Sequence, residues 1–192
     1  MDYYINVIID NYEAELQKVK QNGNVLYYIK EQTPELCLAA VQQYGLALEY
    51  VKEQTFELCL AAVTQNGYAL RFVKDQTYEI CFAAVQQHGR ALEYVEEEQK
   101  TYELFLVAVK QDGYALQFVK EQTLELCFEA VQQQGMSLYF VKEQTPEICL
   151  AAVQQYGLAL EYVKELTLEL CFAVVKKYNI YGLYYLLKSM NF

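Results

Sequence analysis

Six cysteines are the residues whose type and spacing could do chemistry, because thiolates act as nucleophiles and metal ligands. They recur at one position of a regular pattern, which Phe105 fills in one copy. None has the CxxC spacing of metal or redox sites, and stacked helices would hold them about 10 Å apart, too far for a disulfide. We therefore predict buried packing residues, free thiols in a reducing compartment, and no metal or cofactor. The six are Cys37, Cys59, Cys81, Cys127, Cys149 and Cys171.

One histidine and a column of glutamates could supply acid–base chemistry. His88 precedes Gly89 at an expected helix end, and no nucleophile or acid is signalled beside it. The glutamates fall in the first turn of expected helices, where the helix dipole favours a carboxylate. A spacing of about 10 Å keeps them from sharing a proton or a metal. We expect no catalytic residues and a protein that is not an enzyme.

A repeat of about 22 residues sets the elements that carry these side chains. Gly23, Gly45 and Gly67 stand 22 residues apart, the glycines continue to Gly157, and Asn179 takes the next position. Because glycine and asparagine adopt the left-handed conformation, we expect these residues to close helices there.

Each copy is expected to form two short helices, shown by residues 33–54. Thr33 suits an N-cap and Pro34 the first helical position. Residues 46–54 form the second helix, with apolar and charged residues on opposite faces. A pair this short cannot bury its faces alone, so copies must stack. We predict an all-α fold, an α-solenoid of eight two-helix repeats. A parallel β-solenoid is rejected because period-2 alternation is missing.

The expected organisation is a single repeat domain over residues 1–192. Its parts are an N-terminal capping unit (1–23), the repeats (24–179) and a C-terminal capping helix (180–192), because the terminal copies depart from the pattern. Residues 95–101 are two residues longer than their counterparts, which should bend the stack or lengthen a helix.

Charge and hydropathy exclude some classes of partner. The formal net charge is −10, and no basic cluster offsets it, so direct nucleic-acid binding is disfavoured. No uncharged apolar run is long enough to span a membrane, and the start lacks the basic segment of a signal peptide.

Tyrosine is the remaining functional signal, because the chain has 19 tyrosines and no tryptophan. Three positions around the glycine vary between copies while core positions stay constant, as expected of exposed residues. They hold Tyr and Arg, which are enriched at binding hot spots. Neutral surface variation and a protein-binding ridge both remain open. The candidate binding residues are Tyr44, Tyr68, Arg71, Arg90, Tyr114, Tyr139 and Tyr156.

The last expected helix places leucines where charged residues usually sit, at Leu183, Leu186 and Leu187. These could fold back on the stack as a cap, or form a contact between identical chains.

Residues 62–70, AVTQNGYAL, carry a signature that recurs along the chain. It resembles the helical repeats called domain of unknown function 4116. The resemblance implies a protein of giant viruses of amoebae or of intracellular bacteria, with no established activity and no catalytic residues. We expect a scaffold that binds an unidentified host or viral protein. The alternatives are a self-associating virion component and an acidic decoy of a DNA-binding protein.

Overall fold

The computed structural model describes the backbone of residues 2–189 and the side chains of residues 11–179, 181 and 184. All regular elements in this range are helices, as predicted for an all-α helical-repeat solenoid. The chain divides into two compact units, Met1–Lys100 and Thr101–Phe192, and each is described by itself.

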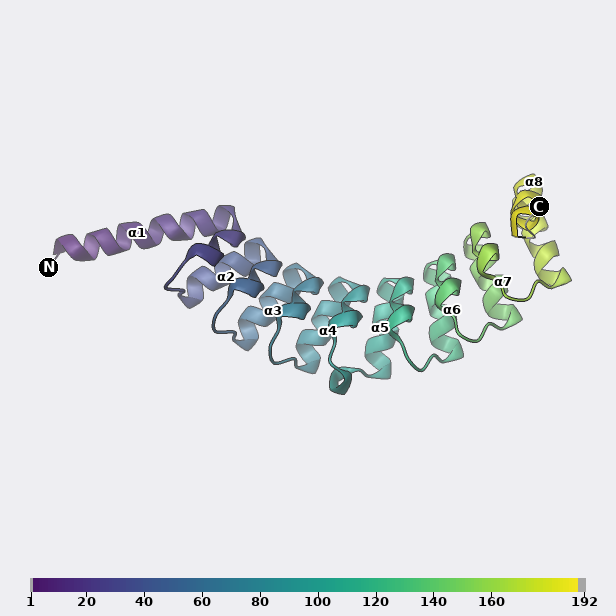
Figure 1. Ribbon diagram of the computed structural model, residues 1–192, viewed down its shortest axis with the longest axis horizontal. Helices are drawn as coiled ribbons and strands as arrows, with labels where there is room; N and C mark the ends of the chain where they lie inside the picture. Colours follow the sequence, from purple (N-terminus) through teal and green to yellow (C-terminus); the bar gives the residue numbers. More distant parts are fainter. Residues whose placement is uncertain (1, 190–192) are drawn as a thin grey trace. The chain divides into compact units, whose positions relative to one another are not determined.

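The first unit alternates α-helices with short 3₁₀ helices (Figure 1). Its elements are α1 (Asp2–Gln21), η1 (Gly23–Tyr28), α2 (Pro34–Gln43), η2 (Gly45–Tyr50), α3 (Phe56–Gln65), η3 (Gly67–Phe72), α4 (Tyr78–Gln87), η4 (Gly89–Tyr94) and η5 (Glu97–Gln99). The second unit continues with α5 (Tyr102–Gln111), η6 (Gly113–Phe118), α6 (Leu124–Gln133), η7 (Gly135–Phe140), α7 (Pro146–Gln155), η8 (Gly157–Tyr162) and α8 (Leu168–Ser189).

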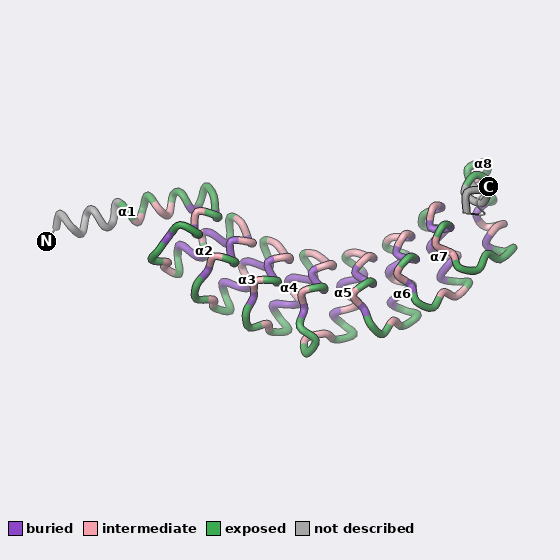
Figure 2. Tube along the Cα trace, in the orientation of Figure 1, coloured by how far each residue is buried: buried purple, intermediate pink, exposed green. Residues whose placement is uncertain are grey.

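Threonine begins the α-helices of both units from α2 onward. In α2 the Thr33 hydroxyl accepts a hydrogen bond from the Leu36 amide at 3.3 Å, which confirms the predicted N-cap. The helix buries Leu36, Cys37, Ala40 and Val41. Figure 2 shows such buried residues running through each unit, with exposed residues in the linkers. Each copy completes its core against its neighbour.

The second helix of each copy is shorter and tighter than predicted. We expected a helix over residues 46–54, but η2 ends at Tyr50 and is a 3₁₀ helix. Its amides bond three residues back, as Ala47 to Tyr44 and Val51 to Leu48. Val51 is already extended, at φ −75° and ψ 120°, so the linker is free to contact other copies.

The predicted role of glycine in left-handed caps is wrong. Among the described residues no glycine has a positive φ. A Cβ on Gly67 would instead lie 2.3 Å from the carbonyl oxygen of Ala84, one copy later. The corresponding distances at Gly23, Gly45, Gly113 and Gly135 are 2.4–2.5 Å. Glycine is needed because the backbone of the next copy occupies the space that a Cβ would fill.

Two irregular segments also differ from expectation. The extra residues near position 97 form η5, while α4 and η4 keep the lengths of their counterparts, so no helix is lengthened. In the last copy the chain passes Asn179 at φ 52° and ψ −125° and continues as helix to Ser189, without a separate 3₁₀ helix. The positive φ fits asparagine, although ψ lies outside the left-handed helical range.

Candidate functional site

The 3₁₀ helices present aromatic side chains on the surface of each unit. We call these residues the aromatic row. Its members are Tyr27, Tyr28, Tyr50, Tyr68, Phe72 and Tyr94 in the first unit, and Tyr114, Phe118, Tyr139, Phe140 and Tyr162 in the second. Tyr27 and Tyr139 occupy the same place in their copies, and each is 66% exposed. The row therefore offers ring surface to solvent in both units.

Contacts between rings hold the row in place in the first unit. Tyr27 meets Tyr28 and Tyr50 edge to face, with centroids 5.0 and 5.3 Å apart. The Tyr68 ring lies against the His88 ring, with centroids 4.6 Å apart. It meets Tyr94 edge to face, with centroids 6.5 Å apart. Edge-to-face pairs are favourable because the ring edge is positive and the ring face negative. Each copy thus orients a ring of its neighbour.

The second unit repeats this arrangement. Tyr139 meets Phe140 at 5.1 Å and Tyr162 at 5.2 Å, both edge to face. Tyr114 meets Phe140 of the next copy edge to face, with ring centroids 6.0 Å apart. The exposed rings are therefore oriented before any partner arrives.

The predicted binding residues fall into two groups. Arg71, Tyr139 and Tyr156 are exposed, and the Arg71 guanidinium lies 4.5 Å from the Phe72 ring centroid. The other four are half-buried: Tyr44, Tyr68, Arg90 and Tyr114. Tyr68 and Tyr114 are less exposed than expected because each packs on a ring of the next copy. The seven residues are divided between the two units, and three of them, Tyr68, Tyr114 and Tyr139, belong to the aromatic row.

The leucines proposed for contacts between identical chains, Leu183, Leu186 and Leu187, lie outside the described side chains.

A recurring glutamine in the linkers was missed from the sequence. Gln32 donates from Nε2 to the Tyr50 carbonyl at 2.8 Å and accepts the Lys52 amide hydrogen at Oε1 at 3.0 Å. One side chain thus bridges two backbone groups of the next copy. The signal was available, because glutamine precedes threonine in most copies. We call these residues the glutamine clamp: Gln32, Gln54, Gln76, Gln122 and Gln144.

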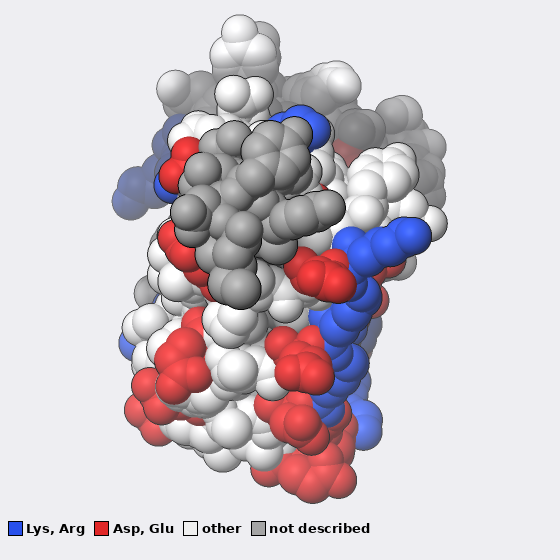
Figure 3. All heavy atoms as spheres, turned by 90° about the vertical axis from the view of Figure 1, so that its left-hand side faces the viewer, with Lys and Arg blue, Asp and Glu red and all other residues white. Residues whose placement is uncertain are grey.

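Lysine and acidic side chains form neighbouring columns, which Figure 3 shows on the side of the molecule that bears α1. The sequence suggested a solvated face of mixed charge. Lys52 and Lys74 are exposed, but their ammonium groups donate to the main-chain carbonyls of Lys30 and Lys52, one copy back. The lysines therefore contribute to the stacking while they keep their charge beside the acidic column.

The cysteines lie where packing residues were predicted, with all but the partly exposed Cys171 buried. Burial raises the pKa of the Cys81 thiol from 9.0 to about 11. It also raises the pKa values of the thiols of Cys37, Cys59, Cys127 and Cys149. These thiols stay protonated at neutral pH, and protonated thiols are poor nucleophiles and metal ligands.

Over the described residues, no group of three or more His, Cys, Asp or Glu side chains is placed to hold a metal ion. Within the same part of the chain, every helix is too short or too polar to cross a membrane.

Comparison with known proteins gives one family. The model described as Domain of unknown function (DUF4116) matches four overlapping stretches: residues 33–77, 55–100, 77–124 and 123–168. Each stretch spans about two copies of the repeat. Searches of curated proteins and of solved structures found no match.

Proposed function

Because this chain belongs to the family Domain of unknown function (DUF4116), whose description names no activity, we propose its function from its surface: it is a non-enzymatic scaffold that binds a protein partner through the aromatic row. The binding is between proteins rather than to nucleic acid, since a net charge of −10 repels phosphates.

The observation that carries this proposal is the exposure of rings that are already held in place. Tyr27 and Tyr139 are each two-thirds exposed, yet each is fixed by contacts to two other rings. Tyrosine is enriched among residues that dominate binding energy. Rings ordered in advance lose little conformational entropy on binding, which favours affinity.

We place this binding in a reducing compartment of a host cell. Six free cysteines support a reducing setting, and the resemblance to viral and bacterial repeats supports a host or viral partner.

Affinity capture from host lysate, read by mass spectrometry, tests the proposal. The test variant carries Tyr27→Gln and Tyr139→Gln, because Gln117 fills the same position in a natural copy. The control carries Thr64→Ala and Gln132→Ala, two exposed changes on α-helices away from the row. We expect a partner that is retained by the control and lost by the test variant. Equal capture by both variants, or capture of nothing by the wild type, would count against it.

Self-association is a second candidate, favoured by the exposed face of α8. Leu168 and Phe172 are 78% and 74% exposed, and Val175 is 39% exposed, although its counterpart Val153 is buried. We expect concentration-dependent growth in mass by light scattering, which Phe172→Glu abolishes. A wild-type chain that stays monomeric at high concentration would sink this candidate.

A further inference from the structure

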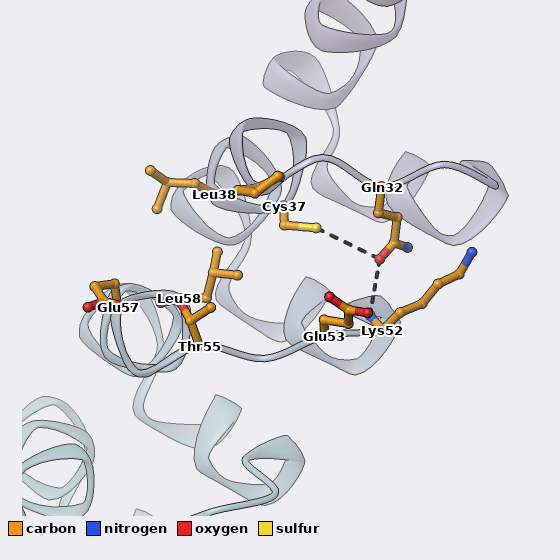
Figure 4. A pocket seen from close by; sticks show the side chains of 9 residues that line it. Gln32, Cys37, Leu38, Lys52, Glu53, Thr55, Glu57 and Leu58 are labelled. Atoms are coloured by element: carbon orange, nitrogen blue, oxygen red, sulfur yellow. Dashed lines mark hydrogen bonds between the residues drawn. The ribbon is translucent and has the colours of Figure 1, made fainter.

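A pocket of about 350 Å³ opens between α2 and α3 in the first unit. Pro34, Leu38 and Leu58 give it apolar walls. Figure 4 shows Cys37 and Gln32 on one side, with Glu57 and Glu53 toward opposite ends. This volume lies near the lower end of the range for small-ligand pockets, and it is large enough for one long side chain.

The same pocket recurs in the second unit, around Pro146. There it consists of two adjoining cavities of about 200 and 60 Å³, which share Pro146, Thr167 and Leu170. Each of the nine residues lining the first pocket has an identical residue 112 positions later that lines one of these two cavities. The site is thus built twice from one set of side chains.

Proline at the first α-helical position is common to the two pockets. All other copies carry a larger side chain at this position. At two of the three tyrosines in this position the hydroxyl reaches the first-turn glutamate of the next copy: Tyr12 donates to Glu35, and Tyr102 donates to Glu125. The counterpart of those glutamates beside Pro34 is Glu57. A proline ring is too short to cover the groove and has no hydroxyl to donate.

The back wall of the pocket already has its hydrogen bonds. The Gln32 oxygen accepts from the Lys52 amide at 3.0 Å and from the Cys37 thiol at 3.8 Å, and its amide nitrogen donates to Tyr50. The Lys52 ammonium donates to the Lys30 carbonyl. A ligand is therefore not needed to satisfy this wall. The ammonium of Lys52 keeps its positive charge, and the lining sets two carboxylates, Glu53 and Glu57, against it.

The two carboxylates of the pocket are different. Glu53 and Glu57 are exposed, and neither side chain has a hydrogen bond or an ion pair within the described part of the chain. The site therefore combines apolar walls with unpaired negative charge. An arginine or lysine side chain complements both features, because its stem packs on apolar surface while its charged end seeks a carboxylate.

We propose that the pockets at Pro34 and Pro146 each receive an arginine or lysine side chain of a partner polypeptide, with the charged group at Glu57 or Glu169. The partner itself rests on the proposed function. The cationic donor takes the place that the tyrosine hydroxyl holds in other copies. The net charge of −10 also attracts a basic partner toward both pockets.

Titration of the full chain with a short peptide tests this proposal. The probe is acetyl-Gly-Ala-Arg-Ala-Gly-amide, and the matched peptide carries citrulline, which has nearly the shape of arginine without the charge. Methyl NMR signals of Leu58 and Leu170 report the two pockets separately. We expect saturable shifts of both leucines with the arginine peptide and at least tenfold weaker binding of the citrulline peptide.

Variants that close one pocket leave the other as an internal control. Pro34→Tyr introduces a residue that natural copies carry at this position, so the fold should be retained. We expect it to abolish the Leu58 response and leave the Leu170 response, and Pro146→Tyr to do the reverse. Glu57→Gln, which keeps the pocket open, should weaken binding at the first pocket several-fold.

Three outcomes would overturn the proposal: no saturable shift in the wild type, equal binding of the two peptides, or an unchanged Leu58 response in Pro34→Tyr. Failure of the proposed function is seen separately. Peptide binding without any captured partner rejects the scaffold and keeps the pockets. Capture that depends on Tyr27 and Tyr139 without peptide binding rejects the pockets and keeps the scaffold.

Discussion

The two helices of one copy differ in what their surroundings require. The α-helix begins at a threonine cap and buries four side chains of nearly constant type, as α2 does. The 3₁₀ helix begins at a glycine where a Cβ would clash with the next copy, then presents side chains that change from copy to copy. Stability thus depends on the buried side chains of the α-helices and on the glycine contact, whereas the exposed positions of the 3₁₀ helices vary from copy to copy.

The strongest way to break this comparison is at the glycine. Gly67→Val places a Cβ 2.3 Å from the Ala84 oxygen, so the copies must separate. We expect the free energy of unfolding to fall by about 3 kcal/mol, the upper end for over-packed sites. Gln65→Ala, which removes an acceptor 2.6 Å from the Gly45 amide, should cost about 1 kcal/mol. Urea unfolding measures both.

Gly67→Asn separates the two explanations for glycine. Asparagine tolerates a left-handed cap but not a close approach, so we expect a loss similar to that of valine. If Gly67→Asn left the stability nearly unchanged, the explanation by a left-handed cap would be supported instead.

A second test removes one residue of the glutamine clamp. Gln54→Leu deletes the donor to the Phe72 carbonyl and the acceptor for the Lys74 amide. We expect a loss of about 1–3 kcal/mol in urea unfolding, since two backbone groups lose their partner. Thr64→Ala, an exposed change on α3, serves as control and should stay within about 0.5 kcal/mol. If the two variants were equally stable, the clamp would contribute nothing to stacking.

Stability at alkaline pH tests whether the cysteine thiols of the α-helices are buried. An unfolded thiol ionises near 9.0, while Cys81 in the folded chain stays protonated to about 11. The stabilising contribution of the protonated Cys81 thiol is fully present below pH 9 and is lost as the pH rises to about 11, so rising pH favours unfolding in this interval. We expect the urea midpoint of Cys81→Ala to fall less steeply from pH 9 to 11 than that of the wild type. If the urea midpoints of Cys81→Ala and the wild type fell with the same slope, burial of this thiol would be contradicted. The control is Cys171→Ala, at a partly exposed site.

The smallest effect on stability is expected in the aromatic row. Tyr139→Gln removes two edge contacts from a ring that is two-thirds exposed, so unfolding should change by less than about 1 kcal/mol. Thermal melting measures this. A loss as large as that of Gly67→Val would make the row a structural element and blur the distinction between the two helices.

Features that depend on neighbouring residues were predictable from the sequence. The Thr33 cap needs only the amide of Leu36, three residues away, and the repeat period follows directly from the glycines. The role of glycine was missed because the contact from Gly67 to Ala84 depends on the distance between copies, which spacing alone does not contain.

The surface was predicted less well for a similar reason. Tyr68 was expected to be exposed, but it is half-buried because its ring lies on His88 of the next copy. Tyr27, among the most exposed tyrosines, was not among the candidates, although it fills the same variable position as Arg71 and Tyr139. Six-residue segments also fit an α-helix and a 3₁₀ helix equally well, so the helix type of residues 45–50 was not evident.

The glutamine clamp has a consequence for how such a chain can grow. Gln32 binds a carbonyl and an amide of the backbone, which every residue type possesses. This joint therefore places no demand on the side chains of the segment that docks on it. Residues 33–53 and 145–165 differ at a single position, Leu36 against Ile148. A joint that recognises only the main chain lets length change by duplication while each copy's exposed residues diversify independently.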